Sequence, residues 1–80
     1  MDPQTTWNEL LEARLKREWN RAAELANALL DWMQRGAFPP ETAGDRTLGT
    51  RWHHAVANFV CHLVLADVRQ ARKRARRKSG

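Results

Sequence analysis

The chain has little of what stabilises or anchors many small proteins. Among its 80 residues there is one cysteine, Cys61, so no disulfide can form within the chain. The longest nearly apolar stretch, residues 55–66, is far shorter than the roughly 20 residues that span a bilayer. The first residues have neither the basic segment nor the apolar segment of a signal peptide. We therefore expect a cytoplasmic protein that does not insert into membranes.

Catalytic and metal-binding motifs are also lacking. The sequence contains no glycine-rich phosphate loop, no HExxH and no GxSxG. His54, Asn58, Cys61 and His62 fall near one side of a predicted helix. However, His54 and His62 are two turns apart, roughly 12 Å, which is too far for one zinc ion. We predict no metal, no cofactor and no enzymatic activity, and we expect Cys61 to be a small core residue.

Acidic residues are absent after Asp67, and this absence defines the end of the chain. Residues 1–68 carry seven basic and nine acidic residues, so the net charge of +5 arises from residues 69–80. We divide the chain into a helical module, 1–68, and a basic tail, 69–80. The tail contains seven basic residues: Arg69, Arg72, Lys73, Arg74, Arg76, Arg77 and Lys78.

An arginine-rich cluster of this kind neutralises phosphates and releases counterions, and guanidinium groups form phosphate forks. We therefore predict that the tail contacts nucleic acid without sequence preference. An acidic protein surface as partner and a tail that only solubilises the protein are the alternatives. The tail has no Trp, Phe or Leu opposite its basic residues, which argues against an amphipathic membrane helix.

Residues 5–35 have a helical pattern. Thr5 or Thr6 is predicted to cap the helix, with Glu9 completing a capping box. Gly36 fits the position just past the C-terminus, and Pro39-Pro40 prevents continuation. Apolar residues recur at steps of three and four, which places them on one helical face. This face consists of Leu11, Leu15, Trp19, Ala22, Ala26, Leu29 and Met33.

A polar cluster at residues 14–18 interrupts this pattern, although no Gly or Pro forces a turn there. One long helix and two shorter helices both remain open, and we favour two. Residues 36–49 form a loop, which we expect to pack over the helices through Phe38, with Leu48 as a second apolar anchor.

Residues 50–77 are predicted to form a second long helix, capped by Thr50, with Thr47 or Asp45 as alternatives. Its seam is predicted from the spacing to consist of Trp52, Val56, Phe59, Leu63 and Ala66. Between residues 55 and 68 the helix is apolar on nearly all sides, so most sides should be buried. We expect three packed helices or, in addition, a homodimer in which this helix contacts its copy. We expect the tail to continue as solvated helix, with charge repulsion causing fraying after about Arg74.

Four tryptophans, Trp7, Trp19, Trp32 and Trp52, are many for a chain of this length. Exposed aromatic rings beside a basic strip can stack on bases. Three of the four are far in sequence from the tail, so core packing is the favoured interpretation. The tail is accordingly predicted to share no aromatic surface with them.

The segment from Trp19 to Pro40 resembles one found in a family of small uncharacterised bacterial helical proteins. The shared features are the first Trp, spaced Ala, Leu29-Leu30-Asp31-Trp32, and Arg35-Gly36-Ala37-Phe38-Pro39-Pro40. Those proteins often have a Gly-Asp turn before the first Trp, where this chain has Lys16-Arg17-Glu18. The resemblance implies a helix break near residue 17, and it implies no activity and no functional residues.

The sequence as a whole predicts an all-α fold, either a small helical hairpin or a three-helix bundle with a long C-terminal helix. The function it favours is that of a small non-enzymatic binding protein whose tail contacts nucleic acid. The alternative is a helical protein-interaction or dimerisation module that binds a helical partner or its own copy.

Overall fold

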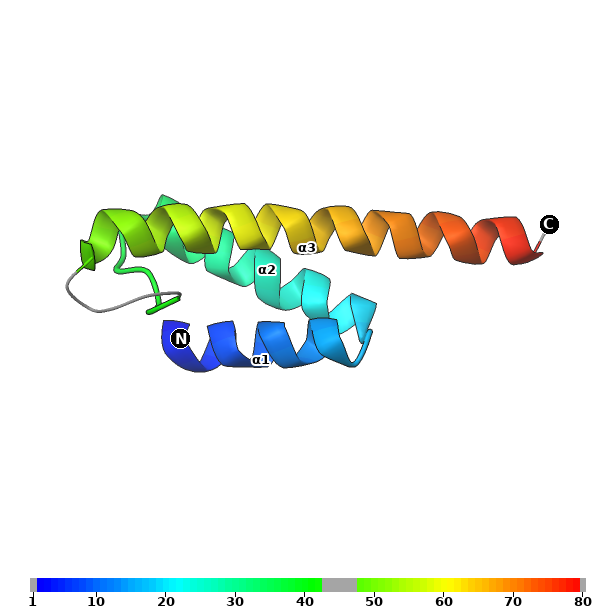
Figure 1. Ribbon diagram of the computed structural model, residues 1–80, viewed down its shortest axis with the longest axis horizontal. Coiled ribbons are helices and arrows are strands. Elements are labelled where there is room, and N and C mark those ends of the chain that lie inside the picture. Colours follow the sequence, from blue (N-terminus) through cyan, green and yellow to red (C-terminus); the bar gives the residue numbers. More distant parts are fainter. Residues whose placement is uncertain (1, 43–47, 80) are drawn as a thin grey trace.

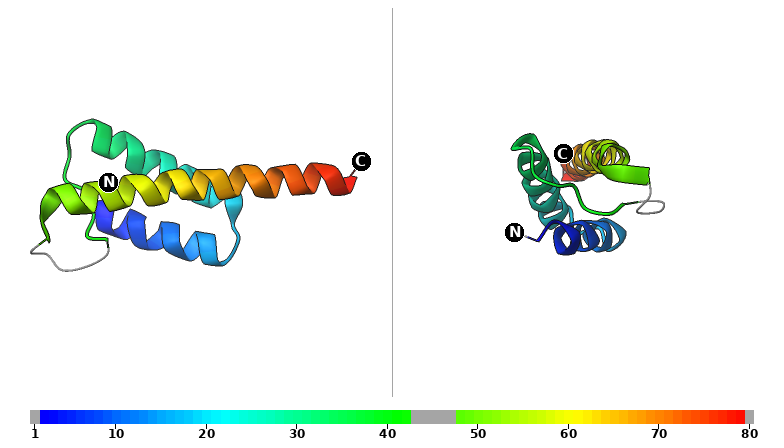
Figure 2. Two further views of the ribbon diagram at one scale, coloured as in Figure 1. Left: turned by 45° about the horizontal axis from the view of Figure 1, so that its top comes forward. Right: turned by 90° about the vertical axis from the view of Figure 1, so that its left-hand side faces the viewer.

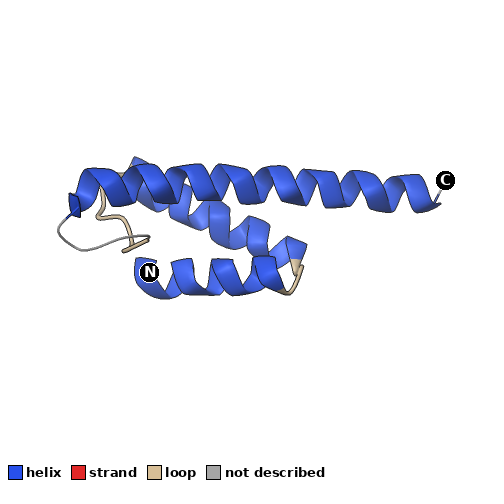
Figure 3. Cartoon of the chain, in the orientation of Figure 1, coloured by secondary structure: helices blue, strands red, loops and turns tan. Residues whose placement is uncertain are grey.

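Three helices follow one another along the chain, as the computed structural model shows for residues 2–42 and 48–79 (Figure 1). They are α1 (Pro3–Leu15), α2 (Trp19–Gln34) and α3 (Gly49–Ser79). The described segments between them are loops and turns (Figure 3). The all-α class with a long C-terminal helix is therefore confirmed, and the chain forms a three-helix arrangement measuring 49 × 23 × 18 Å.

Helix α1 begins two residues earlier than predicted. Asp2 is its N-cap, and one carboxylate oxygen accepts a hydrogen bond from the Gln4 amide at 3.1 Å. Pro3 occupies the first helical position, where its missing N–H is no loss and its fixed φ suits the helix. The predicted caps are wrong: Thr5 and Thr6 lie inside the first turn, and their hydroxyls donate back to Asp2.

The chain breaks between α1 and α2 at residues 16–18, as favoured from the sequence. Arg17 has φ of 57°, a left-handed conformation that places it at the C′ position of α1. The Glu18 amide donates to the Ala13 carbonyl at 2.9 Å, and the Arg17 amide donates to the Arg14 carbonyl at 3.2 Å. These two bonds define a Schellman motif, which usually has glycine where this chain has Arg17. Gly36 ends α2 with φ of 81°, as predicted.

This break shifts the phase of the apolar pattern, so the single predicted face holds only in α2. There Ala22, Ala26, Leu29 and Met33 are buried as expected. In α1 the prediction is wrong, because Leu15 is 81% exposed and Leu11 is also exposed. The apolar side chains that α1 buries instead are Trp7, Leu10 and Ala13.

The connection after α2 is held by polar groups rather than by Phe38. Phe38 is 78% exposed, and Leu48 is also exposed, so neither serves as the predicted apolar anchor. The Trp32 indole donates to the Phe38 carbonyl at 2.8 Å. Nδ1 of the buried His53 accepts from the Thr42 amide at 3.0 Å. The connection therefore packs through Pro40, which is buried, and through these hydrogen bonds, and not through Phe38.

Helix α3 lies along α2, which packs against both of the other helices (Figure 2). It begins at Gly49, so the predicted cap Thr50 is a helical residue, and the alternatives Thr47 and Asp45 lie outside the described residues. The side chains that α3 contributes to the core are Ala57, Cys61, Val64 and Val68. Cys61 is fully buried, as expected, and burial raises its pKa to about 11. The helix continues to Ser79, and the predicted fraying after about Arg74 stays a prediction.

Candidate nucleic-acid interface

The basic tail is an extension of α3 that projects beyond α1 and α2 (Figure 1). Residues 69–79 would be roughly 16 Å long at 1.5 Å of rise per residue. The side chains of Arg69, Arg72, Lys73 and Arg74 are all exposed. Arg76, Arg77 and Lys78 continue the helix, but their side chains lie outside those that the structure describes. Helical geometry therefore places at least four cations along one rod.

Only the first part of the tail contacts the body. The Arg72 guanidinium donates to the Asn20 side-chain oxygen at 3.2 Å, which ties the tail to the first turn of α2. Ala71 is also partly buried. None of the four described tail cations forms an ion pair with another described residue. Their charge is therefore available to an anionic partner.

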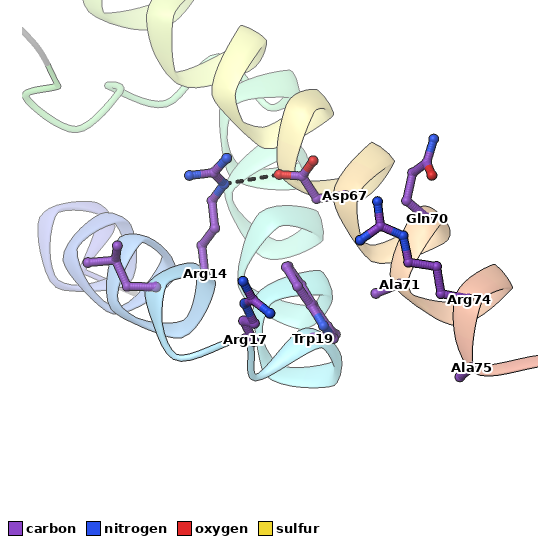
Figure 4. Close-up of a pocket in the computed structure, with 9 residues that line it drawn as sticks. Arg14, Arg17, Trp19, Asp67, Gln70, Ala71, Arg74 and Ala75 are labelled. Carbon is purple, nitrogen blue, oxygen red and sulfur yellow. Dashed lines mark hydrogen bonds and ion pairs between the residues drawn. The ribbon is translucent and has the colours of Figure 1, made fainter. Parts of the chain in front are cut away.

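A groove lies between the tail and the turn that joins α1 to α2 (Figure 4). Its volume is about 990 Å³. The residues that line it come from both ends of the sequence: Arg14, Leu15, Arg17, Trp19, Asp67, Gln70, Ala71, Arg74 and Ala75. Three arginines and one aspartate therefore surround a single indole ring.

The charge of the groove is unevenly compensated. Arg14 Nε pairs with Asp67 Oδ2 at 3.0 Å, so this cation is neutralised within the protein. Arg17 and Arg74 form no ion pair with any residue that the structure describes. Both are exposed, and both line the groove. The groove therefore has two unneutralised guanidinium groups on opposite walls.

Trp19 places an aromatic surface next to the tail. The prediction that the tail shares no aromatic surface with the tryptophans is therefore wrong. It is the first residue of α2, it is partly buried against the core, and it shares the groove with Arg74. Core packing holds fully for Trp7, which is 5% exposed. Trp19 and Trp32 are only partly buried, and Trp52 is exposed.

The predicted seam of the C-terminal helix does not face the three-helix core, because most of it lies on the solvent side of α3. Phe59 is 67% exposed, Trp52 46% and Leu63 42%, and Ala66 is also exposed. The buried seam runs instead through His53, Ala57, Cys61, Val64 and Val68. We call Trp52, Phe59 and Leu63 the outer stripe of α3.

Sequence reasoning missed Arg14, Arg17 and Trp19 as neighbours of the tail. They lie more than 50 residues before Arg74 in the sequence. They come close to the tail only because successive helices are antiparallel, which places the α1–α2 turn next to the tail of α3. The polar cluster at residues 14–18 marked the turn but not its position in space.

No family model, curated protein or solved structure matches this sequence. The resemblance of residues 19–40 to small bacterial helical proteins therefore stays a prediction. None of the helices in the described part of the chain has the length and hydropathy of a membrane span. Residues 2–42 and 48–79 contain no cluster of His, Cys, Asp and Glu with the geometry of a metal site.

Proposed function

We propose that this protein binds nucleic acid through the phosphate backbone, using the basic tail of α3. The observation that carries the proposal is the row of exposed, unneutralised cations Arg69, Arg72, Lys73 and Arg74 on a helix that projects from the body. Binding of this kind is driven by counterion release and is independent of sequence. The helical module positions the tail, and Arg17 adds a further cation from the α1–α2 turn.

Salt dependence gives the direct test. Each phosphate that a protein neutralises on a duplex contributes about −0.9 to the slope of log K against log salt. Replacing Lys73 and Arg74 together by Gln should therefore make the slope shallower by up to about 1.8. The affinity of a labelled duplex is measured by fluorescence anisotropy at several salt concentrations.

A matched control removes the same charge elsewhere. Arg35→Gln with Arg51→Gln lowers the net charge by the same amount at exposed positions outside the tail and the groove, although Arg35, unlike the tail cations, is paired with Asp31 at 2.8 Å. This pair should leave the slope close to that of the unmodified chain. Equal losses in both double variants would mean that net charge, and not the tail, determines binding, and the proposal would be wrong.

A second candidate function, self-association, is favoured by the outer stripe. Apolar patches of a few hundred Å² occur on monomeric proteins, and the largest of them are often functional. A second copy of α3 fits because it offers the same uncharged aromatic and aliphatic side chains. The antiparallel arrangement is favoured, since a parallel pair would place the two basic tails side by side. In this alternative function the tail only keeps the protein soluble.

The size of the stripe predicts a weak dimer. Its exposed apolar surface is on the order of 300 Å² per protomer, given the 150–250 Å² that a single aromatic side chain can bury. Stable interfaces bury at least about 1,200 Å² in total, so a dimer through this stripe alone belongs to the transient class. Association should therefore be visible only at high protein concentration.

Sedimentation of the purified chain tests this candidate. Phe59→Glu should yield a monomer at concentrations where the unmodified chain associates. Asn58→Glu is the control, because it adds the same charge at an exposed position on the same helix but outside the stripe. A chain that stays monomeric at high concentration, or equal effects of both substitutions, would contradict self-association through α3.

A further inference from the structure

The groove between the tail and the α1–α2 turn contains the elements of a nucleotide-binding surface. Trp19 provides an aromatic face, and Arg17 and Arg74 provide cations on either side of it. Figure 4 shows the Trp19 ring beside the Arg17 side chain and facing the part of α3 that carries Ala71 and Arg74. This combination of a π-face with flanking cations is the one by which proteins bind single strands.

The position of Trp19 suits this role better than a purely structural one. Its ring is partly buried against the core on one side, so its orientation is held by packing. The rest of the side chain lines the groove. Within the described residues, the indole N–H of Trp19 makes no hydrogen bond, whereas that of Trp32 donates to the Phe38 carbonyl. Trp19 thus retains both a ring surface and a donor for a ligand.

The backbone at Arg17 provides an independent observation. A left-handed conformation is unfavourable for a residue with a Cβ, and glycine is the usual choice at the C′ position. This chain uses glycine at the equivalent position of α2, where Gly36 has φ of 81°, but arginine at the end of α1, where φ is 57°. Strained backbone of this kind is concentrated at functional sites. The conformation directs a guanidinium into the groove where glycine would place none.

We propose that this groove binds an unpaired nucleotide of a single-stranded nucleic acid, with the base stacked on Trp19 and its phosphates on Arg17 and Arg74. The inference rests on the proposed function and adds a preference for single strands. A duplex cannot use the groove in this way, because the faces of its bases are already stacked on one another. At about 990 Å³ the groove is large enough for a base with its sugar and phosphate.

The test compares one single strand and one duplex of equal length, about 12 nucleotides, close to the site sizes known for single-strand binders. The single-stranded probe is oligothymidylate, which forms no internal pairs. Replacing Trp19 by Leu, which keeps apolar bulk but has no π-face, should lower the affinity for oligothymidylate about tenfold. The affinity for the duplex should not change, because the tail cations are intact. Phe38→Leu is the control, since it removes an exposed aromatic ring that does not line the groove.

A second measurement does not depend on the stability of the variant. Photocrosslinking of the unmodified chain to a thiouridine-substituted strand, followed by peptide mapping, should identify Trp19 or an adjacent groove residue. Crosslinks confined to Trp52 or Phe38, or equal losses of single-strand and duplex affinity in Trp19→Leu, would overturn the inference. The proposed function fails differently, by the absence of salt-dependent binding to either probe.

Discussion

The left-handed conformation of Arg17 leads to a quantitative prediction about stability. Placing an L-residue in this conformation costs about 1–2 kcal/mol, a penalty that glycine does not have. Glycine in turn gains freedom in the unfolded chain, which lowers stability by about 0.5–1 kcal/mol. Arg17→Gly should therefore stabilise the fold by about 0.5–1 kcal/mol. The Schellman bonds to Ala13 and Arg14 are unaffected, because they involve backbone atoms only.

For a domain of this size, 1 kcal/mol corresponds to a shift of about 4–8 °C in Tm. Thermal and urea unfolding, followed by circular dichroism, measure the change in the free energy of unfolding. The same variant should bind oligothymidylate more weakly, because the groove loses one of its two unneutralised cations. Higher stability with lower affinity is the combination expected where strain is retained for binding.

Gly36→Ala provides the matched control with the opposite sign. No heavy atom lies within 4 Å of the position where its Cβ would be, so the substitution tests backbone conformation without a steric clash. At φ of 81° it should lower stability by about 1 kcal/mol. If Arg17→Gly left stability unchanged or reduced it while Gly36→Ala behaved as expected, then the arginine side chain would be stabilising the turn. In that case the argument from strain would be wrong.

Two further predictions concern pH. Burial raises the pKa of Cys61 from 9.0 to about 11, so the unfolded thiol ionises first and stability should fall as pH rises through this interval. The pH dependence of urea unfolding should be smaller in Cys61→Ala, and the chain has no tyrosine to titrate in the same range. The pKa of the Asp2 carboxyl is lowered from 3.8, chiefly by the hydrogen bond from the Thr5 hydroxyl. Asp2→Ala should therefore reduce stability at neutral pH, and the difference from the unmodified chain should vanish as pH falls through that lowered pKa. A difference that persists at low pH would show that the carboxylate charge is not involved.

The contrast between α2 and α1 shows what periodicity can and cannot predict. In α2 a single stripe of Ala22, Ala26, Leu29 and Met33 predicts the buried face correctly, because the helix is unbroken. Extending the same stripe backwards through the break predicts Leu15 in the core, and the structure exposes it. Because the chain changes direction at residues 16–18, the buried face of α1 is not a continuation of the buried face of α2. Only the three-dimensional structure shows which residues of α1 point inward.

Helix α3 presents a different difficulty, since apolar residues occur on nearly all its sides. The spacing of large apolar residues favours the face of Trp52, Phe59 and Leu63, yet the buried face has the small residues Ala57 and Cys61. Helix α2 buries two alanines, Ala22 and Ala26, in the same core. Small side chains on both helices allow close approach of their backbones, and dense packing favours such complementary surfaces. The choice thus depends on the partner helix, which the pattern of α3 alone does not contain.

In the two proposals, the helical tail provides affinity for any nucleic acid, and the groove provides the preference for single strands. Arg69 and Lys73 are four residues apart and lie on one side of α3, while Arg72 is turned toward Asn20 and Arg74 toward the groove. Cations distributed around a rod create a positive field on all sides, which attracts any nucleic acid without orienting it. The groove is different, because Trp19, Arg17 and Arg74 converge there on one place. If both proposals hold, changes in the tail should alter the strength and salt dependence of binding to all nucleic acids. Changes at Trp19 should alter only the preference for single strands.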